Sequence, residues 1–243
     1  MEKNKLIVAN HKMYMNPNEV GEYLKGIIGK ITTSNIIICP SSIYVPYFLK
    51  HKFSVGVQNI CGENEGAYTG EISAKQVSEF GIKYSLVGHS ERRIYFDEDN
   101  DLINKKIKNL LEHNIHPILC IGETNEEKNL LKTNKILKSE IVSCLKDIKP
   151  EDFDKIIIAY EPIWAIGTNR IPTMEEIKNN VKYIKEMVNK IYKAEVKVLY
   201  GGSVNTNNIE KLNKISCLDG FLIGGSSTKA KEFLSIIEVV VNQ

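Results

Sequence analysis

The sequence lacks any run of the roughly 18 consecutive apolar residues that a membrane-spanning helix needs. It has no Cys-x-x-Cys pair, and its five cysteines lie far apart, at Cys39, Cys61, Cys120, Cys144 and Cys217. This spacing favours reduced thiols in a core over disulfides or zinc ligands. The sequence also lacks an excess of one charge, with 32 Lys and Arg against 30 Asp and Glu. A nucleic acid or a membrane surface is therefore not expected as a partner, and an anion site would have to be built locally.

The start of the chain has charged residues around a short apolar run, too short for the hydrophobic region of a signal peptide. Without a membrane span, the sequence predicts a cytoplasmic protein. A composition of 42% hydrophobic and 26% charged residues is ordinary for a globular domain. No linker, low-complexity stretch or composition break divides the 243 residues. We therefore expect a single domain over residues 1–243, a length that one α/β barrel commonly has.

Eight short apolar runs recur along the chain with longer amphipathic segments between them. The runs cover residues 5–10, 35–40, 53–58, 83–88, 116–122, 155–160, 196–202 and 220–225. Most hold four or five consecutive apolar residues, which is typical of parallel strands covered on both faces. The intervening segments predict helices, among them residues 101–113, 126–145, 174–192 and 228–241. Thr173, followed three residues later by Glu176, predicts a capping box at one of these helices.

Strand–helix alternation repeated eight times fits a closed barrel or a large doubly wound sheet. No Gly-x-Gly-x-x-Gly motif follows the first run, so the dinucleotide-binding form of the open sheet loses its main support. The predicted fold class is α/β, a single-domain (β/α)8 barrel of the TIM type.

Polar residues follow several of the runs, at the strand ends where such barrels carry their chemistry. Those after the first, fourth and sixth runs are Asn10, Lys12, His89, Glu91 and Glu161. Gly-Gly-Ser follows each of the last two runs, where these barrels frequently hold a phosphate. Each residue alone would be an ordinary surface charge, structural histidine or turn. Their convergence on one rim predicts a functional site.

These residue types suit removal of a proton from a carbon beside a carbonyl group. A carboxylate such as Glu161 can take the proton while a neutral imidazole such as His89 polarises the carbonyl oxygen. Lys12 would add positive charge where an enediolate forms, and a bound phosphate would supply binding energy away from the reacting carbon. No cluster of metal-ligand residues is evident, so we predict neither a metal nor another cofactor.

Seven segments resemble the triosephosphate isomerase family, in the family's order. They are NxK at 10–12, QN and GAYTGE between 58 and 71, GHSERR at 88–93, CIGET at 120–124, AYEPIWAIGT at 159–168, YGGS at 200–203 and DGFLIGG at 219–225. The resemblance covers essentially the whole chain. It implies a cofactor-free aldose–ketose isomerase that interconverts dihydroxyacetone phosphate and D-glyceraldehyde 3-phosphate through an enediolate, in glycolysis and gluconeogenesis.

The resemblance also implies roles for the matching residues. Glu161 would be the general base and His89 the electrophile, while Asn10 and Lys12 would contact the substrate and Glu91 would orient Lys12. The implied phosphate contacts are Gly167, Ser203, Gly224 and Gly225. Residues 162–172 would form a lid over the intermediate. The loop around Thr69 would dock into a second subunit, which implies a homodimer.

Four places depart from the family's usual pattern. His11 stands where a tryptophan is common, and Asp97 where a glycine is frequent. In the lid, Asn169 and Arg170 replace a usual Gly-Lys, and Pro172 replaces a usual alanine. None of these changes removes a chemical group that the reaction needs.

Two alternatives stay open at the level of the residues. The first is another phosphosugar barrel enzyme, although an epimerase would need metal ligands at the strand ends. A Schiff-base aldolase would need a lysine late in the sixth strand, where the chain has Ala159 and Tyr160. The second is a barrel that binds phosphate without catalysis, which the loss of Glu161 or His89 would have favoured.

Overall fold

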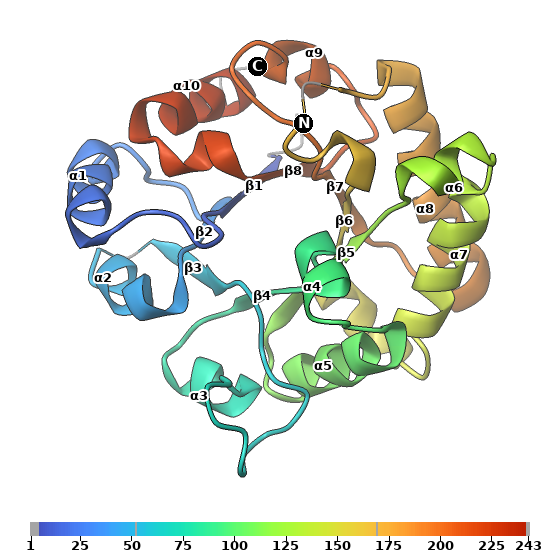
Figure 1. Cartoon of the computed structure of the whole chain (residues 1–243), viewed down its shortest axis with the longest axis horizontal. Helices are drawn as coiled ribbons and strands as arrows, with labels where there is room; N and C mark the ends of the chain where they lie inside the picture. The colour runs from blue at the N-terminus through green and yellow to red at the C-terminus, as the bar shows by residue number, and fades with distance from the viewer. Residues whose placement is uncertain (1–4, 52, 169, 242–243) are drawn as a thin grey trace.

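The computed structural model describes residues 5–51, 53–168 and 170–241. Within these residues, eight parallel strands close into a barrel in chain order, with β8 paired to β1 (Figure 1). The strands are β1 (Leu6–Asn10), β2 (Ile36–Cys39), β3 (Ser54–Val57), β4 (Tyr84–Val87), β5 (His116–Ile121), β6 (Ile157–Tyr160), β7 (Lys197–Tyr200) and β8 (Gly220–Ile223). The predicted (β/α)8 fold is confirmed. Because the strands are parallel, their carboxyl ends meet at one rim.

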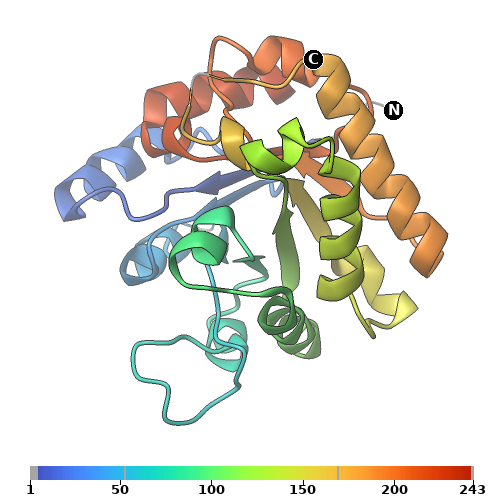
Figure 2. The same ribbon diagram turned by 45° about the vertical axis from the view of Figure 1, so that its right-hand side comes forward.

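Helices surround the barrel on its outer side (Figures 1 and 2). The α-helices are α1 (Pro17–Ile27), α2 (Val45–Leu49), α3 (Ala74–Glu79), α4 (Ser90–Tyr95), α5 (Asn100–Glu112), α6 (Asn125–Asn129), α7 (Thr133–Cys144), α8 (Met174–Tyr192), α9 (Ile209–Asn213) and α10 (Ala230–Val241). Short 3₁₀ helices are η1 (Ser42–Tyr44), η2 (Pro150–Lys155), η3 (Ile163–Ala165) and η4 (Gly225–Thr228). The bounds predicted for α8 are confirmed. So is its capping box, in which Thr173 Oγ1 accepts from Glu176 N at 3.1 Å and the Glu176 carboxylate accepts from Thr173 N at 2.7 Å.

The single helix predicted over residues 126–145 is wrong, because the structure divides it into α6 and α7. Leu131 adopts a left-handed conformation with φ +56° and ends α6. Leu131 N donates to Lys128 O at 2.9 Å, and Lys132 N donates to Glu127 O at 2.8 Å. These are the two hydrogen bonds of a Schellman motif, which usually has glycine at the left-handed position. Since leucine occupies that position here, the sequence carried no signal for the break.

The other predicted helices need small corrections. α5 begins and ends one residue earlier than predicted, since the Asp99 side chain accepts from Leu102 N and caps it. The helix predicted from residue 228 begins at Ala230, because the preceding residues form η4. Asp97, which replaces a frequent glycine of the family, has φ +53°. Glycine adopts this left-handed conformation most easily, and aspartate tolerates it better than most residues.

The apolar runs are continuous because both faces of each strand are buried. Along β1, Val8 lies inside the barrel with Ile37 and Leu86, while Ile7 and Ala9 pack between the strands and the helices. Buried apolar surface contributes about 25 cal/mol per Å² to folding, so both layers stabilise the barrel. A rigid barrel of this kind holds the loops at its rim in a defined arrangement.

Candidate active site

A cavity of about 280 Å³ opens at the carboxyl-terminal rim of the barrel. Its lining residues are Asn10, Lys12, Tyr14, His89, Glu161, Ile166, Gly167, Thr168, Gly201, Gly202, Ser203, Val204, Leu222, Gly224 and Gly225. Every residue that the sequence analysis named as a catalytic or phosphate contact is in this set. The barrel therefore brings together groups from the first, fourth, sixth, seventh and eighth strand ends.

His89 and Glu161 face each other inside this cavity. His89 Nε2 lies 3.3 Å from Glu161 Oε1, and their side chains are only 7% and 3% exposed. His89 also caps α4, because its Nδ1 accepts a hydrogen bond from Glu91 N at 3.3 Å. A neutral imidazole has one donor and one acceptor nitrogen. With Nδ1 accepting, the proton lies on Nε2, the nitrogen that faces Glu161.

Close backbone contacts hold Glu161 in place. Glu161 N donates to Ile121 O at 2.8 Å, and Ser90 N lies 3.5 Å from Glu161 Oε2. A Cβ atom added to Gly122 would lie 1.8 Å from Glu161 O, and one added to Gly201 would lie 2.7 Å from Glu161 Cγ. Both positions therefore require glycine, which explains these two motif glycines on steric grounds.

Lys12 adopts a left-handed conformation with φ +50°. For a lysine this costs about 1–2 kcal/mol, so the surroundings must hold it. Lys12 N donates to Asn10 Oδ1 at 3.0 Å, and Gln58 Nε2 donates to Lys12 O at 2.8 Å. The Lys12 ammonium donates to Glu91 Oε1 at 2.6 Å. These contacts direct the ammonium toward the cavity, and they give Gln58 a role that the sequence analysis did not assign.

The glycine turns after β7 and β8 line the same cavity as Lys12, and Gly224 of the second turn lies beside the Lys12 side chain. A Cβ atom on Gly224 would lie 3.3 Å from Lys12 Cε. Gly167 lies on the lid side of the cavity and has φ +65°. Backbone N–H groups and an ammonium around one small cavity suit the binding of an anion such as a phosphate.

The segment predicted to form a lid is attached to the barrel through Glu123, a residue the sequence analysis did not single out. Trp164 Nε1 donates to Glu123 Oε1 at 2.8 Å, and Tyr160 Oη donates to the same carboxylate at 3.2 Å. Glu123 is buried, and this burial raises the pKa of its carboxyl, while the Trp164 hydrogen bond opposes that effect. Glu123 directly follows a predicted strand within the CIGET segment. This position was the sequence feature that could have identified it as a residue of the site. Asn169, another lid residue, lies outside the described residues.

His11 is fully buried beside the site, between Asn10 and Lys12 in the chain. Its ring packs edge-on against Tyr23 and Phe48, with centroid distances of 4.8 and 5.7 Å. Neither ring nitrogen has a hydrogen-bond partner by distance and angle among the described residues. Burial lowers the pKa of His11 to about 4, and the Ser227 backbone opposes this only in part. The ring therefore occupies an apolar aromatic space and is neutral near pH 7.

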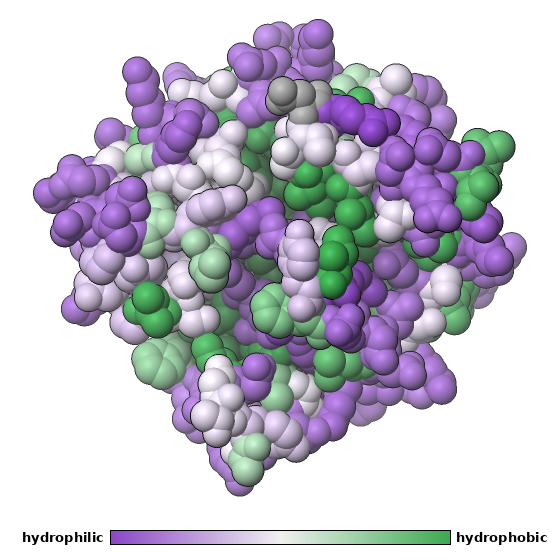
Figure 3. Space-filling view, viewed as in Figure 1, coloured by the Kyte–Doolittle hydropathy of each residue, from purple (hydrophilic) through white to green (hydrophobic). Residues whose placement is uncertain are grey.

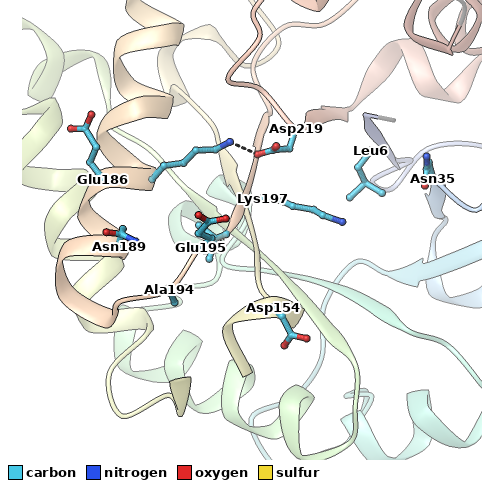
Figure 4. Close-up of a pocket in the computed structure, with 11 residues that line it drawn as sticks. Leu6, Asn35, Asp154, Glu186, Asn189, Ala194, Glu195, Lys197 and Asp219 are labelled. Atoms are coloured by element: carbon cyan, nitrogen blue, oxygen red, sulfur yellow. Dashed lines mark ion pairs between the residues drawn. The ribbon is translucent and has the colours of Figure 1, made fainter. Parts of the chain in front are cut away.

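A larger cavity of about 810 Å³ lies at the other end of the barrel, among the residues where strands begin (Figure 4). Leu6, Lys197 and Asp219 contribute to it, and Lys185 forms an ion pair with Asp219 at 2.5 Å. Its described lining contains none of the predicted site residues. In (β/α)8 barrels this end contributes to stability, and catalysis takes place at the opposite rim.

A parallel barrel with a carboxylate, an imidazole and an ammonium beside glycine turns defines a (β/α)8-barrel enzyme for a small anionic substrate. The family model described as triosephosphate isomerase matches residues 5–240. The chain belongs to the triosephosphate isomerase family, and its activity is the isomerisation of triose phosphates, a step of glycolysis. The family and the enzyme class predicted from the sequence are confirmed.

Triosephosphate isomerases from several bacteria are similar over nearly their whole length. The protein of Clostridium botulinum (strain Okra / Type B1) is 39% identical over 242 residues, which cover 96% of this chain and 98% of that protein. That of Dictyoglomus turgidum is 39% identical over 246 residues, covering 97% and 99%. That of Alkaliphilus oremlandii is 36% identical over 242 residues, covering 96% and 98%.

Among residues 5–51, 53–168 and 170–241, no helix is both long and apolar enough to cross a membrane. The same residues contain no group of three or more His, Cys, Asp or Glu side chains that could hold a metal ion.

Proposed function

We propose that Glu161, His89, Lys12 and Asn10 carry out the interconversion of dihydroxyacetone phosphate and D-glyceraldehyde 3-phosphate, without a metal or other cofactor. The observation that carries this proposal is the distance of 3.3 Å between His89 Nε2 and Glu161 Oε1 in a buried cavity. A base and a neutral hydrogen-bond donor so close together can act on adjacent atoms of one small substrate.

In the proposed reaction, the Glu161 carboxylate takes a proton from the carbon beside the substrate carbonyl. The electron pair of that C–H bond forms the enediolate, whose developing negative charge lies on the former carbonyl oxygen. His89 Nε2–H donates a hydrogen bond to this oxygen, and the Lys12 ammonium and Asn10 amide stabilise it. The hydroxyl proton on the first carbon is then transferred to the former carbonyl oxygen, a transfer for which His89 is in position. Glu161 returns its proton to the former carbonyl carbon, and the first carbon becomes the new carbonyl. Electrostatic stabilisation is strong here because the two facing side chains are almost fully buried.

The phosphate of the substrate is proposed to bind at Gly167, Ser203, Gly224 and Gly225. These residues line the cavity on the side formed by the lid and the last two strand ends. Binding there would place the triose carbons toward His89 and Glu161, so that phosphate binding energy orients the reacting atoms. Glu91 would keep the Lys12 ammonium in position through their ion pair of 2.6 Å.

The proposal extends to the protein's setting in the cell. It includes a cytoplasmic location, a role in gluconeogenesis as well as glycolysis, and one domain over residues 1–243. The near balance of 32 basic and 30 acidic residues fits an enzyme that acts on small molecules better than a protein that binds nucleic acid or membranes.

The test is an assay of the purified chain with D-glyceraldehyde 3-phosphate, coupled to an enzyme that consumes dihydroxyacetone phosphate. We expect full activity after exhaustive dialysis against EDTA, because no step of the proposed reaction uses a metal. Activity that disappears under EDTA and returns with a divalent ion would contradict the cofactor-free mechanism.

The loop of residues 58–73 supports the proposal of a homodimer. It projects away from the barrel between β3 and α3 (Figures 1 and 2). Thr69, within this loop, is exposed. Apolar side chains are exposed in the turn after β1, in η1 and in α4, with Met13 94%, Ile43 72% and Tyr95 73% exposed. Figure 3 shows apolar groups on this face in the region of α2 and α4. A second subunit that received the Thr69 loop would bury surface of this kind.

We expect Thr69→Glu to weaken dimerisation by about tenfold or more, because an unpaired carboxylate would be buried at the interface. Light scattering over a range of concentrations measures the effect, with Thr32→Glu as the control in an exposed loop at the other end of the barrel. An active wild-type monomer at micromolar concentration would rule out the dimer.

A further inference from the structure

Arg93 lies behind the active site, outside the lining of the site cavity. Its side chain, 15% exposed, connects three segments of the chain. Arg93 Nε donates to Gly88 O at 2.9 Å, directly before His89. One terminal nitrogen donates to Asn100 Oδ1 at 2.7 Å, and the other donates to Cys120 O at 3.3 Å. The guanidinium therefore joins the end of β4, the start of α5 and β5.

Glu140 of α7 completes this arrangement from the other side. Its Oε2 accepts a hydrogen bond from Gly122 N at 2.9 Å, and its Oε1 lies 3.6 Å from Arg93 Nη1. The Glu140 side chain is 11% exposed. A carboxylate on a helix of the outer layer thus holds the backbone at the end of β5, with the Arg93 charge beside it.

The two backbone segments that this pair holds are the ones beneath His89 and Glu161. Gly88 precedes His89, and Arg93 holds its carbonyl oxygen. On the other side, Glu161 N donates to Ile121 O, and Gly122 is in such close contact with Glu161 O that a Cβ atom could not fit. A shift of Gly122 or Gly88 would therefore move the base or the imidazole.

We propose that Arg93 and Glu140 act together as positioning residues that set the separation of His89 and Glu161. This inference rests on the proposed roles of His89 and Glu161 in the reaction. Neither Arg93 nor Glu140 lines the cavity, so they act through the backbone and not by contact with the substrate.

The chemistry of the pair suits this role. A guanidinium has five donors in a rigid planar fork, so it can hold several carbonyl oxygens at fixed angles, and a lysine cannot replace it in this respect. Burial raises the pKa of Glu140 to about 7, whereas Arg93 and the Gly122 N–H act to lower it. Arg93 thus helps to keep Glu140 charged, and the charged carboxylate is the stronger acceptor for Gly122 N.

The test compares Arg93→Lys, Glu140→Gln and the double variant. Arg93→Lys keeps the positive charge and removes the planar guanidinium with its five donors. Glu140→Gln keeps the shape of the side chain and removes the negative charge. We expect kcat per folded molecule to fall by about tenfold or more in each single variant, since small misplacements of reacting groups are costly. KM and competitive inhibition by inorganic phosphate are expected to stay within about twofold, because Gly224 and Gly225 are not held by this pair. The double variant is expected to lose little more than the single ones, because the two residues act as a unit.

Leu137→Ala is the matched control, since it opens a cavity under the same helix α7 and removes no hydrogen bond to the Gly88 or Gly122 backbone. We expect it to lower the melting temperature and to leave kcat per folded molecule unchanged. If Arg93→Lys fails to fold, the near-isosteric Glu140→Gln decides the question.

Three results would overturn the positioning role. They are an unchanged kcat in Glu140→Gln, additive losses in the double variant, and a parallel loss of phosphate inhibition that indicates general distortion of the rim. Glu161→Gln, assayed in parallel, separates this failure from that of the proposed mechanism. If Glu161→Gln is impaired while the Arg93 and Glu140 variants are fully active, only the positioning role is wrong. If Glu161→Gln is itself fully active, the proposed mechanism is wrong.

Discussion

Glu161→Gln is expected to lower kcat by about 10²–10⁴, which is the usual contribution of a positioned general base. The amide has nearly the same shape as the carboxylate and can still accept a hydrogen bond from Ser90 N, but it cannot take the substrate proton. Steady-state kinetics in both directions measure the loss. Competitive inhibition by inorganic phosphate is expected to change far less, since the proposed phosphate contacts are at other strand ends.

Glu126→Gln is the control for this experiment. Glu126 is an exposed carboxylate at the start of α6, beyond the cavity lining, and we expect its amide variant to keep full activity. A Glu161→Gln enzyme with more than half of the wild-type kcat would show that another group is the base.

The second large effect concerns stability at acid pH. The pKa of His11 is lowered from 6.5 to about 4 by burial, so between these values the unfolded chain binds a proton that the folded chain does not. The free energy of unfolding therefore falls as the pH falls. The His11 contribution to this loss is absent above pH 6.5 and is complete near pH 4. At 1.36 kcal/mol per pKa unit, the full loss is about 3 kcal/mol.

His11→Phe is expected to remove this loss, because a phenyl ring fits between Tyr23 and Phe48 and does not titrate. Urea unfolding at several pH values between 7 and 4.5 measures the effect in the variant and in the wild type. The difference between the two proteins is the informative quantity, since other groups also titrate here. Glu140, whose pKa is raised to about 7, acts in the opposite direction because its folded form binds the proton more tightly.

His51→Gln serves as the control, since it removes an exposed histidine and should leave the pH dependence as in the wild type. Equal pH dependence in His11→Phe and the wild type would refute the prediction. Because His11 stands between Asn10 and Lys12, we also expect acid inactivation to begin with loss of order around these two proposed substrate contacts.

Local patterns in the sequence were sufficient for much of the fold. The bounds of α8 and its capping box followed from Thr173 and Glu176, because both hydrogen bonds of the box join residues three apart. The strands were evident because burial on both faces demands continuous apolar residues, as in residues 6–9 of β1. The gathering of Asn10, His89 and Glu161 in one cavity followed from a general rule, since parallel strands in a closed barrel end at the same rim.

The tertiary structure decided what depends on contacts between residues far apart in the chain. The break at Leu131 requires a left-handed leucine, which no local preference indicates. The left-handed Lys12 is held by Gln58, and the lid residue Trp164 is held by Glu123. The sequence by itself thus determined the barrel, the family and the chemical groups at the rim, because these follow from periodicity and from residue identity. The burial of His11 and the connection of Arg93 to Glu140 were decided by packing, because they depend on which helix lies against which strand.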